Sequence, residues 1–255
     1  MVFDKNTARS CDDWLKSPIG DYVNSREKKL ILTLLAPKEG EKLLDVGCKT
    51  GNNLLFLRRA GCDVTGIDSS LSMLETARKK LGDRADFYSG SPEDLPFSDN
   101  EFDVVTLINC LEFVENPQKA IEEAIRVSRE RVFLGFLNKY SFNATQSVKS
   151  LIFPLSLYNE ARFFSIWEVN NIVKSVLSGT SIQWGSVIFL PLNWYPFAAG
   201  IEKCIPVAKN PFGSFIGLTF PVVYTHRTLQ DPIEASLKVS KAGGQLPGTA
   251  REMKK

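Results

Sequence analysis

Short apolar runs alternate with amphipathic segments between residues 41 and 137. Five of these runs have the length of strands, and the segments between them carry apolar residues at helical spacing. This alternation is typical of βαβ units, in which helices connect parallel strands. The strands are expected at residues 42–46, 63–67, 85–89, 102–108 and 131–137. The pattern therefore predicts a doubly wound α/β fold.

Capping residues mark the expected helix boundaries. The apolar residues within 71–81 share one helical face, and Gly82 follows as a stop signal. Asn116 and Pro117 are typical of an N-cap and a first helical residue. The stretch "SIWE", residues 165–168, has the form of a capping box and predicts a later helix.

Two later apolar runs, at residues 181–190 and 214–224, are expected to pair as an antiparallel hairpin at the edge of the sheet. The expected architecture is a seven-stranded, mostly parallel sheet with helices on both faces. Residues 1–230 are expected to form a single domain. Within it we expect an N-terminal helical cap at about 8–38 and an insertion at about 138–164, and the polar residues 231–255 are expected to be a flexible tail.

Composition narrows the classes of partner. The 255 residues carry a formal net charge of +2, which gives no electrostatic reason to expect nucleic acid. The five cysteines are scattered and form no CxxC pair, so we expect neither a zinc site nor a disulfide framework. The chain begins without a signal-peptide pattern, and no apolar run approaches the roughly 18 residues that span a bilayer. A cytoplasmic protein without a membrane span is expected.

The stretch "LLDVGCKTGNN", residues 43–53, joins the first strand to a glycine turn. Gly47 and Gly51 permit positive φ angles and a close approach of a ligand to the backbone. The spacing is not the G-x-G-x-x-G of a dinucleotide site, which argues against a nucleotide-dependent oxidoreductase. Asp45 at the strand end would repel a diphosphate and would suit an ammonium or sulfonium cation. The turn therefore favours a cationic ligand.

The second strand also ends in an acid, Asp68, which follows Asp45 by 23 residues. A carboxylate at this position can accept both ribose hydroxyls of a nucleoside. Two acids at the ends of neighbouring strands around a glycine turn describe a pocket for a cationic nucleoside. S-adenosylmethionine (SAM) fits that description.

These stretches resemble the class I SAM-dependent methyltransferases, in particular the small-molecule enzymes of the methyltransferase type 11 group. The resemblance covers residues 41–137 through "LLDVGCKTG", "VTGIDSSLSML", "GSPEDLPFSDNEFDVV" and "LEFVENPQKAIEEAIRV". It implies a Rossmann-like fold, SAM as cofactor, and methyl transfer to a small-molecule acceptor. The aromatic residues of the insertion, including Tyr140 and Phe142, favour a hydrophobic acceptor. The cofactor-binding residues that it implies are Asp45, Gly47, Cys48, Gly51, Asp68, Ser69, Met73, Ser91, Glu93 and Asn109.

Two residues depart from the family pattern. Lys49 stands where the first motif usually has glycine, and Ser91 stands where the third motif often has an acid. We expect Lys49 to keep an ordinary φ angle, with its side chain in solvent, against a carboxylate of the ligand, or obstructing SAM. These departures motivate an alternative, a non-catalytic SAM-binding or scaffold protein.

No fixed catalytic residue follows from the sequence. A sulfonium already carries a good leaving group, so the protein mainly has to desolvate and align the acceptor. A base is needed only when the acceptor holds a proton at that stage. Glu112 and Tyr140 are candidates, and the alternative for Glu112 is an exposed helix glutamate. The lone histidine, His226, is expected to be non-catalytic.

Overall fold

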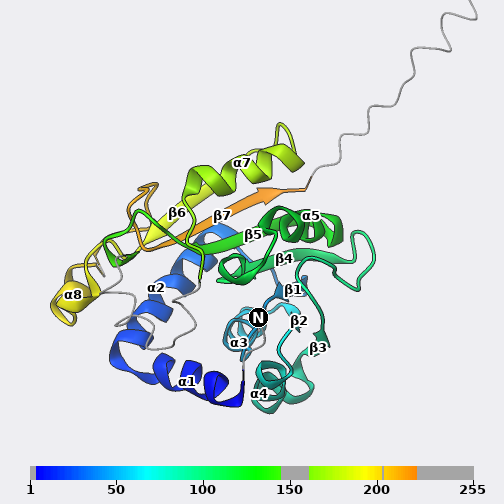
Figure 1. Cartoon of the computed structure of the whole chain (residues 1–255), viewed down its shortest axis with the longest axis horizontal. Coiled ribbons are helices and arrows are strands. Elements are labelled where there is room, and N and C mark those ends of the chain that lie inside the picture. The colour runs from blue at the N-terminus through cyan, green and yellow to red at the C-terminus, as the bar shows by residue number, and fades with distance from the viewer. Residues whose placement is uncertain (1–3, 145–160, 203, 223–255) are drawn as a thin grey trace, which may run out of the picture. The chain divides into compact units, whose positions relative to one another are not determined.

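The computed structural model describes residues 4–144, 161–202 and 204–222, all of them within one compact unit that spans residues 1–223 (Figure 1). The tail expected at residues 231–255 lies outside the described residues, and the single domain expected at 1–230 stays a prediction. Among the described residues, no helix is long and apolar enough to cross a membrane. These residues also contain no group of three or more His, Cys, Asp or Glu side chains that could hold a metal ion.

The described residues form a seven-stranded sheet in the order β3-β2-β1-β4-β5-β7-β6. The first five strands pair in parallel, and β7 pairs antiparallel with β5 and β6. The mostly parallel sheet and its antiparallel edge are therefore confirmed. The strands are β1 (Lys42–Val46), β2 (Asp63–Asp68), β3 (Asp86–Ser89), β4 (Phe102–Ile108), β5 (Ser128–Leu137), β6 (Gln183–Val187) and β7 (Phe215–Pro221).

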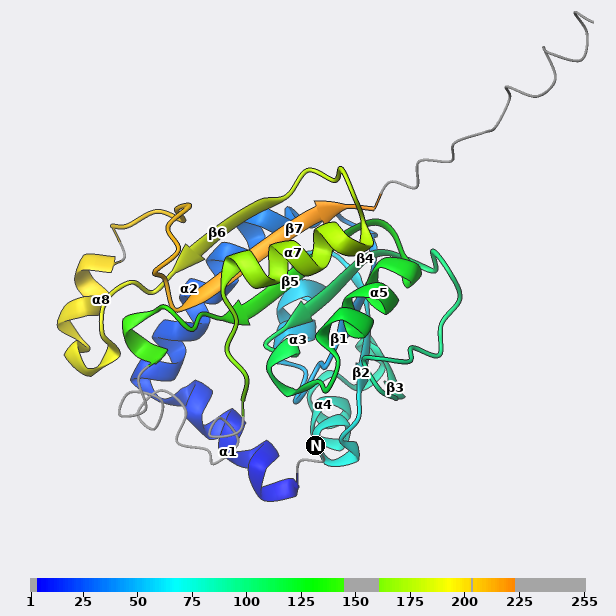
Figure 2. The same ribbon diagram turned by 45° about the horizontal axis from the view of Figure 1, so that its top comes forward.

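Helices cover both faces of the sheet (Figures 1 and 2). They are α1 (Lys5–Lys16), α2 (Pro18–Leu35), α3 (Asn52–Arg59), α4 (Leu71–Leu81), α5 (Pro117–Val127), α7 (Ile166–Val176) and α8 (Phe197–Glu202). Successive residues of a strand point to opposite faces. In β1, Leu44 accordingly packs with α5 and α7, whereas Leu43 packs with α2 and α3. The buried apolar side chains thus form two cores, one on each face of the sheet.

The expected caps are present. Asn116 accepts a hydrogen bond from the backbone N–H of Lys119 at 3.1 Å, and Gly82 follows the last residue of α4. Ser165 and Glu168 form a complete capping box at the start of α7. These three predictions from local sequence are confirmed, because a cap depends on residues only a few positions apart.

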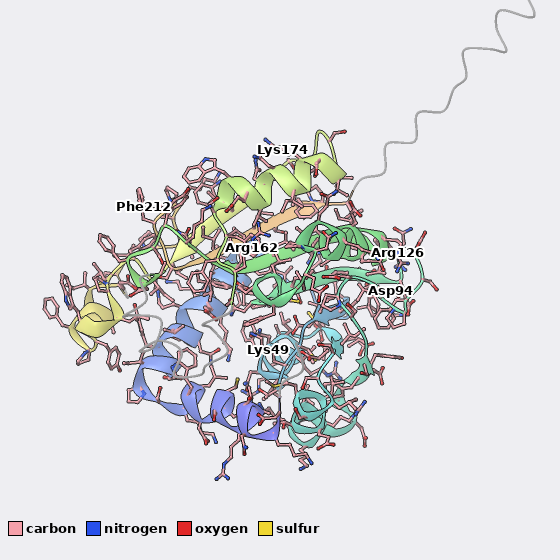
Figure 3. The ribbon with its side chains drawn as sticks, in the orientation of Figure 1. Lys49, Asp94, Arg126, Arg162, Lys174 and Phe212 are labelled. Atoms are coloured by element: carbon pink, nitrogen blue, oxygen red, sulfur yellow. The ribbon has the colours of Figure 1, made fainter. Side chains whose placement is uncertain are left out.

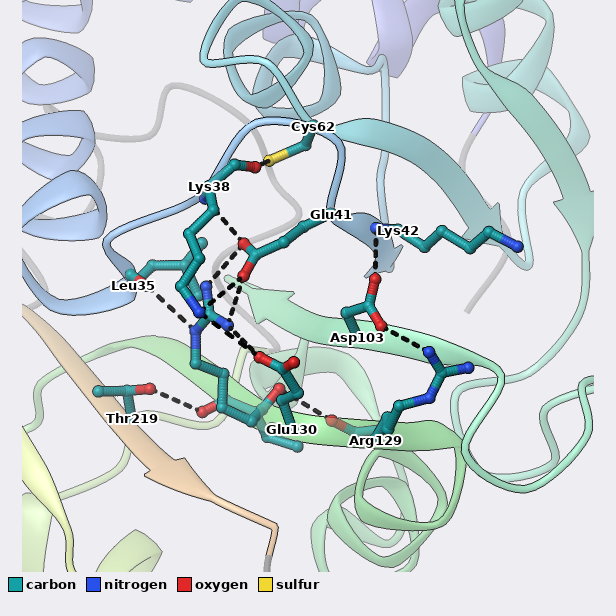
Figure 4. A network of polar contacts seen from close by, with 12 residues as sticks. Leu35, Lys38, Glu41, Lys42, Cys62, Asp103, Arg129, Glu130 and Thr219 are labelled. Atoms are coloured by element: carbon teal, nitrogen blue, oxygen red, sulfur yellow. Dashed lines mark hydrogen bonds and ion pairs between the residues drawn. The ribbon is translucent and has the colours of Figure 1, made fainter.

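Glu41, just before β1, pairs with Arg131 near the beginning of β5. Figure 4 shows the polar contacts around Glu41. Two guanidinium nitrogens of Arg131 donate to the two carboxylate oxygens of Glu41, each at 2.8 Å. Only 9% of the Glu41 side chain and 16% of the Arg131 side chain are exposed. Burial alone would raise the pKa of Glu41, but the hydrogen bonds from Arg131 and from the backbone N–H of Lys38 outweigh it and lower that pKa.

Glu41→Gln is therefore expected to lower the free energy of unfolding by about 2–3 kcal/mol at pH 7, because it leaves Arg131 without its buried charged partner. A carboxyl with a lowered native pKa stabilises above its unfolded value of 4.5, and this contribution is lost as the pH falls through the native pKa. Urea unfolding of both proteins at pH 7 and pH 3 measures the difference, which should shrink at pH 3. Glu130→Gln, at a half-exposed partner of Arg131, should cost less than about 0.5 kcal/mol; equal losses would contradict the prediction.

Candidate cofactor site

The turn after β1 holds three residues with positive φ angles: Gly47 at 72°, Lys49 at 50° and Gly51 at 75°. A Cβ on Gly47 would lie 2.7 Å from Cys110 Sγ, and a Cβ on Gly51 would lie 3.0 Å from the Cβ of Ala77. A side chain at either position would be strained by its positive φ and would also push against these neighbours, which favours glycine. The expectation of an ordinary φ for Lys49 is wrong, since the turn holds this residue in the left-handed region that favours glycine.

Asp45 is buried at the end of β1, with 1% of its surface exposed. Its Oδ1 accepts a hydrogen bond from the Thr106 hydroxyl at 2.8 Å, whereas its Oδ2 has no hydrogen-bond partner among the described residues. Burial raises the pKa of Asp45 to about 7, although the Thr106 hydrogen bond and the charge of Lys49 oppose the rise. A buried carboxylate oxygen without a partner is costly unless a ligand supplies one.

Asp68 lies at the end of β2, the neighbour of β1 in the sheet. Its Oδ2 accepts the backbone N–H of Lys49 at 2.9 Å, and its Oδ1 accepts the backbone N–H of Ser70 at 2.8 Å. Burial raises the pKa of Asp68, and the two hydrogen bonds and the charge of Lys49 partly offset that rise. A carboxylate oxygen can accept more than one hydrogen bond. Asp68 can therefore hold the turn and still accept hydroxyl groups of a ligand.

Two cavities meet at this turn. Cavity A has a volume of about 300 Å³ and is lined by Asp68, Ser69, Ser91, Glu93, Phe113 and Glu115, among others. Cavity B has a volume of about 90 Å³ and is lined by Cys11, Trp14, Glu27, Cys48, Thr50 and Asn53, among others. Gly47, Lys49 and Asn109 line both cavities. The site therefore extends from the ends of β1, β2 and β4 to the inner side of α1 and α2.

Of the ten cofactor-binding residues expected from the sequence, seven line one or both cavities and three line neither. Gly47, Asp68, Ser69, Ser91, Glu93 and Asn109 line cavity A, and Gly47, Cys48 and Asn109 line cavity B. Asp45, Gly51 and Met73 are buried behind the cavity walls. The structure thus brings most of the set to one place, and their role in binding stays a prediction.

The two candidate catalytic residues lie in different environments. Glu112 is 2% exposed, so its reading as an exposed glutamate is wrong. Its Oε1 accepts the backbone N–H of Leu137 at 2.6 Å, and its Oε2 has no hydrogen-bond partner within the described part of the chain. Burial raises the pKa of Glu112 to about 7. Tyr140 is 52% exposed, packs its ring edge against Trp167 and lines neither cavity.

Glu27 of α2 is a site residue that the sequence reasoning missed. It lines cavity B and forms a side-chain hydrogen bond with Asn109, and burial raises its pKa to about 7. A sequence signal existed, because Glu27 lies one helical turn from the buried residues Val23 and Ile31 and thus on the apolar face of α2. An acid on an apolar helix face indicates either an internal partner or a ligand.

Comparisons with known proteins agree with this geometry. Residues 44–135 match the family model described as a methyltransferase domain. The ubiquinone/menaquinone biosynthesis C-methyltransferase UbiE of Roseobacter denitrificans is 41% identical over 109 residues, which cover 40% of this chain and 44% of that protein. The chain therefore spans less than half the length of this relative.

Solved structures share the fold over most of the chain. A SAM-dependent methyltransferase from Thermotoga maritima, described as a possible histamine N-methyltransferase, has a TM-score of 0.69 at 20% identity and covers 86% of this chain and 97% of its own. Magnesium protoporphyrin IX methyltransferase from Synechocystis, with bound S-adenosylhomocysteine (SAH), has a TM-score of 0.54 at 18% identity and covers 81% and 88%. Residues 44–135 of this chain therefore match a methyltransferase domain, and the solved structures show the same fold over most of the chain.

Proposed function

We propose that this protein transfers a methyl group from SAM to a small, hydrophobic acceptor. The observation that carries the proposal is the pair of buried carboxylates, Asp45 and Asp68, at the ends of adjacent strands around the glycine turn. The residues fit SAM. Asp45 lines neither cavity, so it would act on a cationic ligand through its charge. The remaining acceptor positions on Asp68, which lines cavity A, suit ribose hydroxyls.

When bound, SAM supplies a methyl group on a sulfonium with a thioether leaving group. The protein has to exclude water and hold the acceptor in line, and it has to accept a proton if the acceptor releases one. Trp14 of α1 and Phe113 of the short helix η2 (Leu111–Phe113) wall the cavities. Glu27 lines cavity B and has a raised pKa of about 7, so at neutral pH it is partly ionised and suited to take a proton. Glu112 has a pKa of about 7 too, but it lines none of the three cavities.

A third cavity, of about 20 Å³, is lined mostly by apolar side chains but has room for only about one water-sized molecule. Its walls include Val23, Leu137, Phe163, Ile188, Leu192 and Phe215, and Glu27 also lines it. Glu27 therefore lies where this apolar cavity approaches cavity B. An acceptor with an apolar body would have to widen this cavity, and its reactive polar atom would then lie near Glu27. UbiE is named as a C-methyltransferase of ubiquinone and menaquinone biosynthesis, and an acceptor of similar apolar character suits these walls.

Titration calorimetry with SAM, SAH and NAD tests the cofactor assignment, and transfer of a labelled methyl group to phenols, hydroquinones and amines tests the reaction. We expect heat with SAM and SAH and none with NAD; the absence of heat with SAM would refute the proposal. SAM binding without transfer to any acceptor would favour a non-catalytic SAM-binding protein. Lys49, at the glycine position of the first motif, is the observation that favours this second candidate.

Asp12 holds α1 next to the site through hydrogen bonds. Its Oδ1 accepts hydrogen bonds from the Thr50 hydroxyl at 2.7 Å, from Asn52 Nδ2 at 3.1 Å and from Lys80 Nζ at 2.9 Å. These contacts connect α1 to the glycine turn and to α4, and α1 supplies Cys11, Trp14 and Leu15 to cavity B.

Asp12→Ala is expected to weaken SAM binding about threefold to tenfold, because α1 loses its connection to the turn while the carboxylates of the site remain. Calorimetry at pH 7.5 measures the change, and Asp13→Ala, at an exposed position of the same helix, should leave the affinity within twofold. Equal effects of the two substitutions would show that the Asp12 contacts do not support the site.

A further inference from the structure

Lys49 stands at the junction of the two cavities. Its side chain lines both cavity A and cavity B, together with Gly47 and Asn109. Figure 3 shows Lys49 between the N-terminal helices and the carboxyl ends of the strands. The side chain is partly buried, and its Nζ lies 5.2 Å from the ring centroid of Phe113, which is within the range of a cation–π interaction. The ammonium group therefore lies inside the site, and the expectation of a side chain in solvent is wrong.

The charge of Lys49 affects the pKa of four acids. Burial raises the pKa of Asp45, Glu27 and Glu112 to about 7 each, and it also raises the pKa of Asp68. The charge of Lys49 opposes the rise in all four. Two of these acids, Asp45 and Glu112, keep a carboxylate oxygen without a hydrogen-bond partner among the described residues. The acids are therefore arranged around a positive charge, and Lys49 supplies one.

We propose that Lys49 is a resident cation of the cofactor site, which shares the carboxylates with the positive charge of SAM and so reduces the preference of the protein for SAM over SAH. The inference rests on the proposed function. SAM and SAH differ by one methyl group and by the positive charge on sulfur. A glycine at position 49 would leave the carboxylates to the ligand, whereas the lysine already compensates them before the ligand binds.

In such a site, the product SAH should compete strongly with SAM. Like charges in a site of low dielectric repel one another, and the repulsion acts on the sulfonium of SAM but not on the neutral sulfur of SAH. The lysine therefore penalises the substrate form of the cofactor more than the product form. Methyl transfer should be correspondingly sensitive to inhibition by SAH.

Charge and bulk at position 49 can be separated by three substitutions. Lys49→Met keeps the length of the side chain and removes its charge, Lys49→Arg keeps a charge, and Lys49→Gly removes both charge and bulk. In calorimetry at pH 8 and low salt, Lys49→Met should bind SAM about tenfold more tightly than the wild type and should change SAH affinity less than threefold. Lys49→Arg should keep the wild-type ratio of the two affinities, and Lys49→Gly should shift the ratio as Lys49→Met does. Lys79→Met, on the exposed side of α4, is the matched control and should change neither affinity.

The melting temperature of the protein without ligand provides a second measurement. Without the lysine charge, the ionised forms of Asp45, Asp68, Glu27 and Glu112 are less compensated. Lys49→Met should therefore melt below the wild type at pH 8, and the difference should shrink at pH 6, where these acids take up protons. The charge of Lys49 also acts to lower the pKa of the Cys11 and Cys110 thiols. Burial raises the pKa of both by more, so they stay neutral. The charge of Lys28, the next residue of α2, also lowers the pKa of Glu27, and it is unchanged in all variants.

Each outcome of the calorimetry supports or overturns the role of Lys49 as a resident cation. A tenfold shift of the SAM to SAH ratio in Lys49→Met supports the resident cation. An equal change in both affinities would overturn it in favour of a steric effect, and weaker SAM binding by Lys49→Met would overturn it in favour of a contact with the cofactor carboxylate. If neither the wild type nor any variant binds SAM or SAH, the proposed function itself fails.

Discussion

Replacing Asp68 by alanine should weaken the binding of SAM and SAH by about ten- to a hundredfold. The carboxylate lines cavity A, is 5% exposed, and has acceptor capacity left after its hydrogen bonds to Lys49 and Ser70. Hydrogen bonds to a charged group contribute roughly 1.5–3 kcal/mol, and each 1.4 kcal/mol corresponds to about a factor of ten in affinity. Loss of ribose contacts alone therefore accounts for one to two decades. Calorimetry at pH 7.5 measures the change.

A ligand without ribose hydroxyls separates this contact from damage to the turn. The 2′,3′-dideoxy analogue of SAH lacks the groups that Asp68 is expected to hold, so Asp68→Ala should reduce its affinity less than threefold. Asp63→Ala, at the exposed beginning of the same strand, should leave SAH binding unchanged. If Asp68→Ala weakens SAH and the dideoxy analogue equally, Asp68 acts on the turn and the ribose assignment is refuted.

The sheet could be read from the sequence because its signals are local. Each predicted parallel strand coincides with an observed strand to within three residues at either end, as β1 (Lys42–Val46) and β4 (Phe102–Ile108) illustrate. In a parallel sheet that is covered on both faces, the strands become continuous apolar runs that a short window detects. The largest difference is in β5, which begins at Ser128, directly after α5, with polar residues at the edge of the core.

The site was only partly readable because several of its features arise from long-range contacts. The acids at the strand ends and the glycines were predicted from their spacing. The left-handed φ of Lys49 follows from a turn that fits between Cys110 and Ala77, both distant in sequence. Similarly, the burial of Glu112 follows from its hydrogen bond to Leu137, and the place of Asp12 follows from its contact with Lys80. Such pairings are fixed by the tertiary fold and leave no local pattern.

SAM affinity should rise with pH through about pH 7, and Asp45 should be a main cause. Burial raises the pKa of Asp45 to about 7 in the protein without ligand. A ligand cation in the neighbouring cavity would lower this pKa through its charge, so binding should release a proton. When the pH falls below this pKa, most of the carboxyl is protonated, and SAM affinity should fall about tenfold between pH 8 and pH 6. Calorimetry in two buffers of different ionisation enthalpy measures both the affinity and the proton release.

Two variants of the Asp45–Thr106 pair show whether this carboxylate is responsible, because Glu27 and Glu112 also have a pKa of about 7. Asp45→Asn keeps an oxygen that can accept the Thr106 hydroxyl but carries no charge, so it should bind SAM at least tenfold more weakly at pH 8 and show a flatter pH dependence. Thr106→Val removes the hydrogen bond that lowers the pKa of Asp45, so it should move the midpoint of the affinity change to higher pH. A midpoint that stays in place in Thr106→Val, together with an undiminished slope in Asp45→Asn, would assign the titration to the other acids around Lys49.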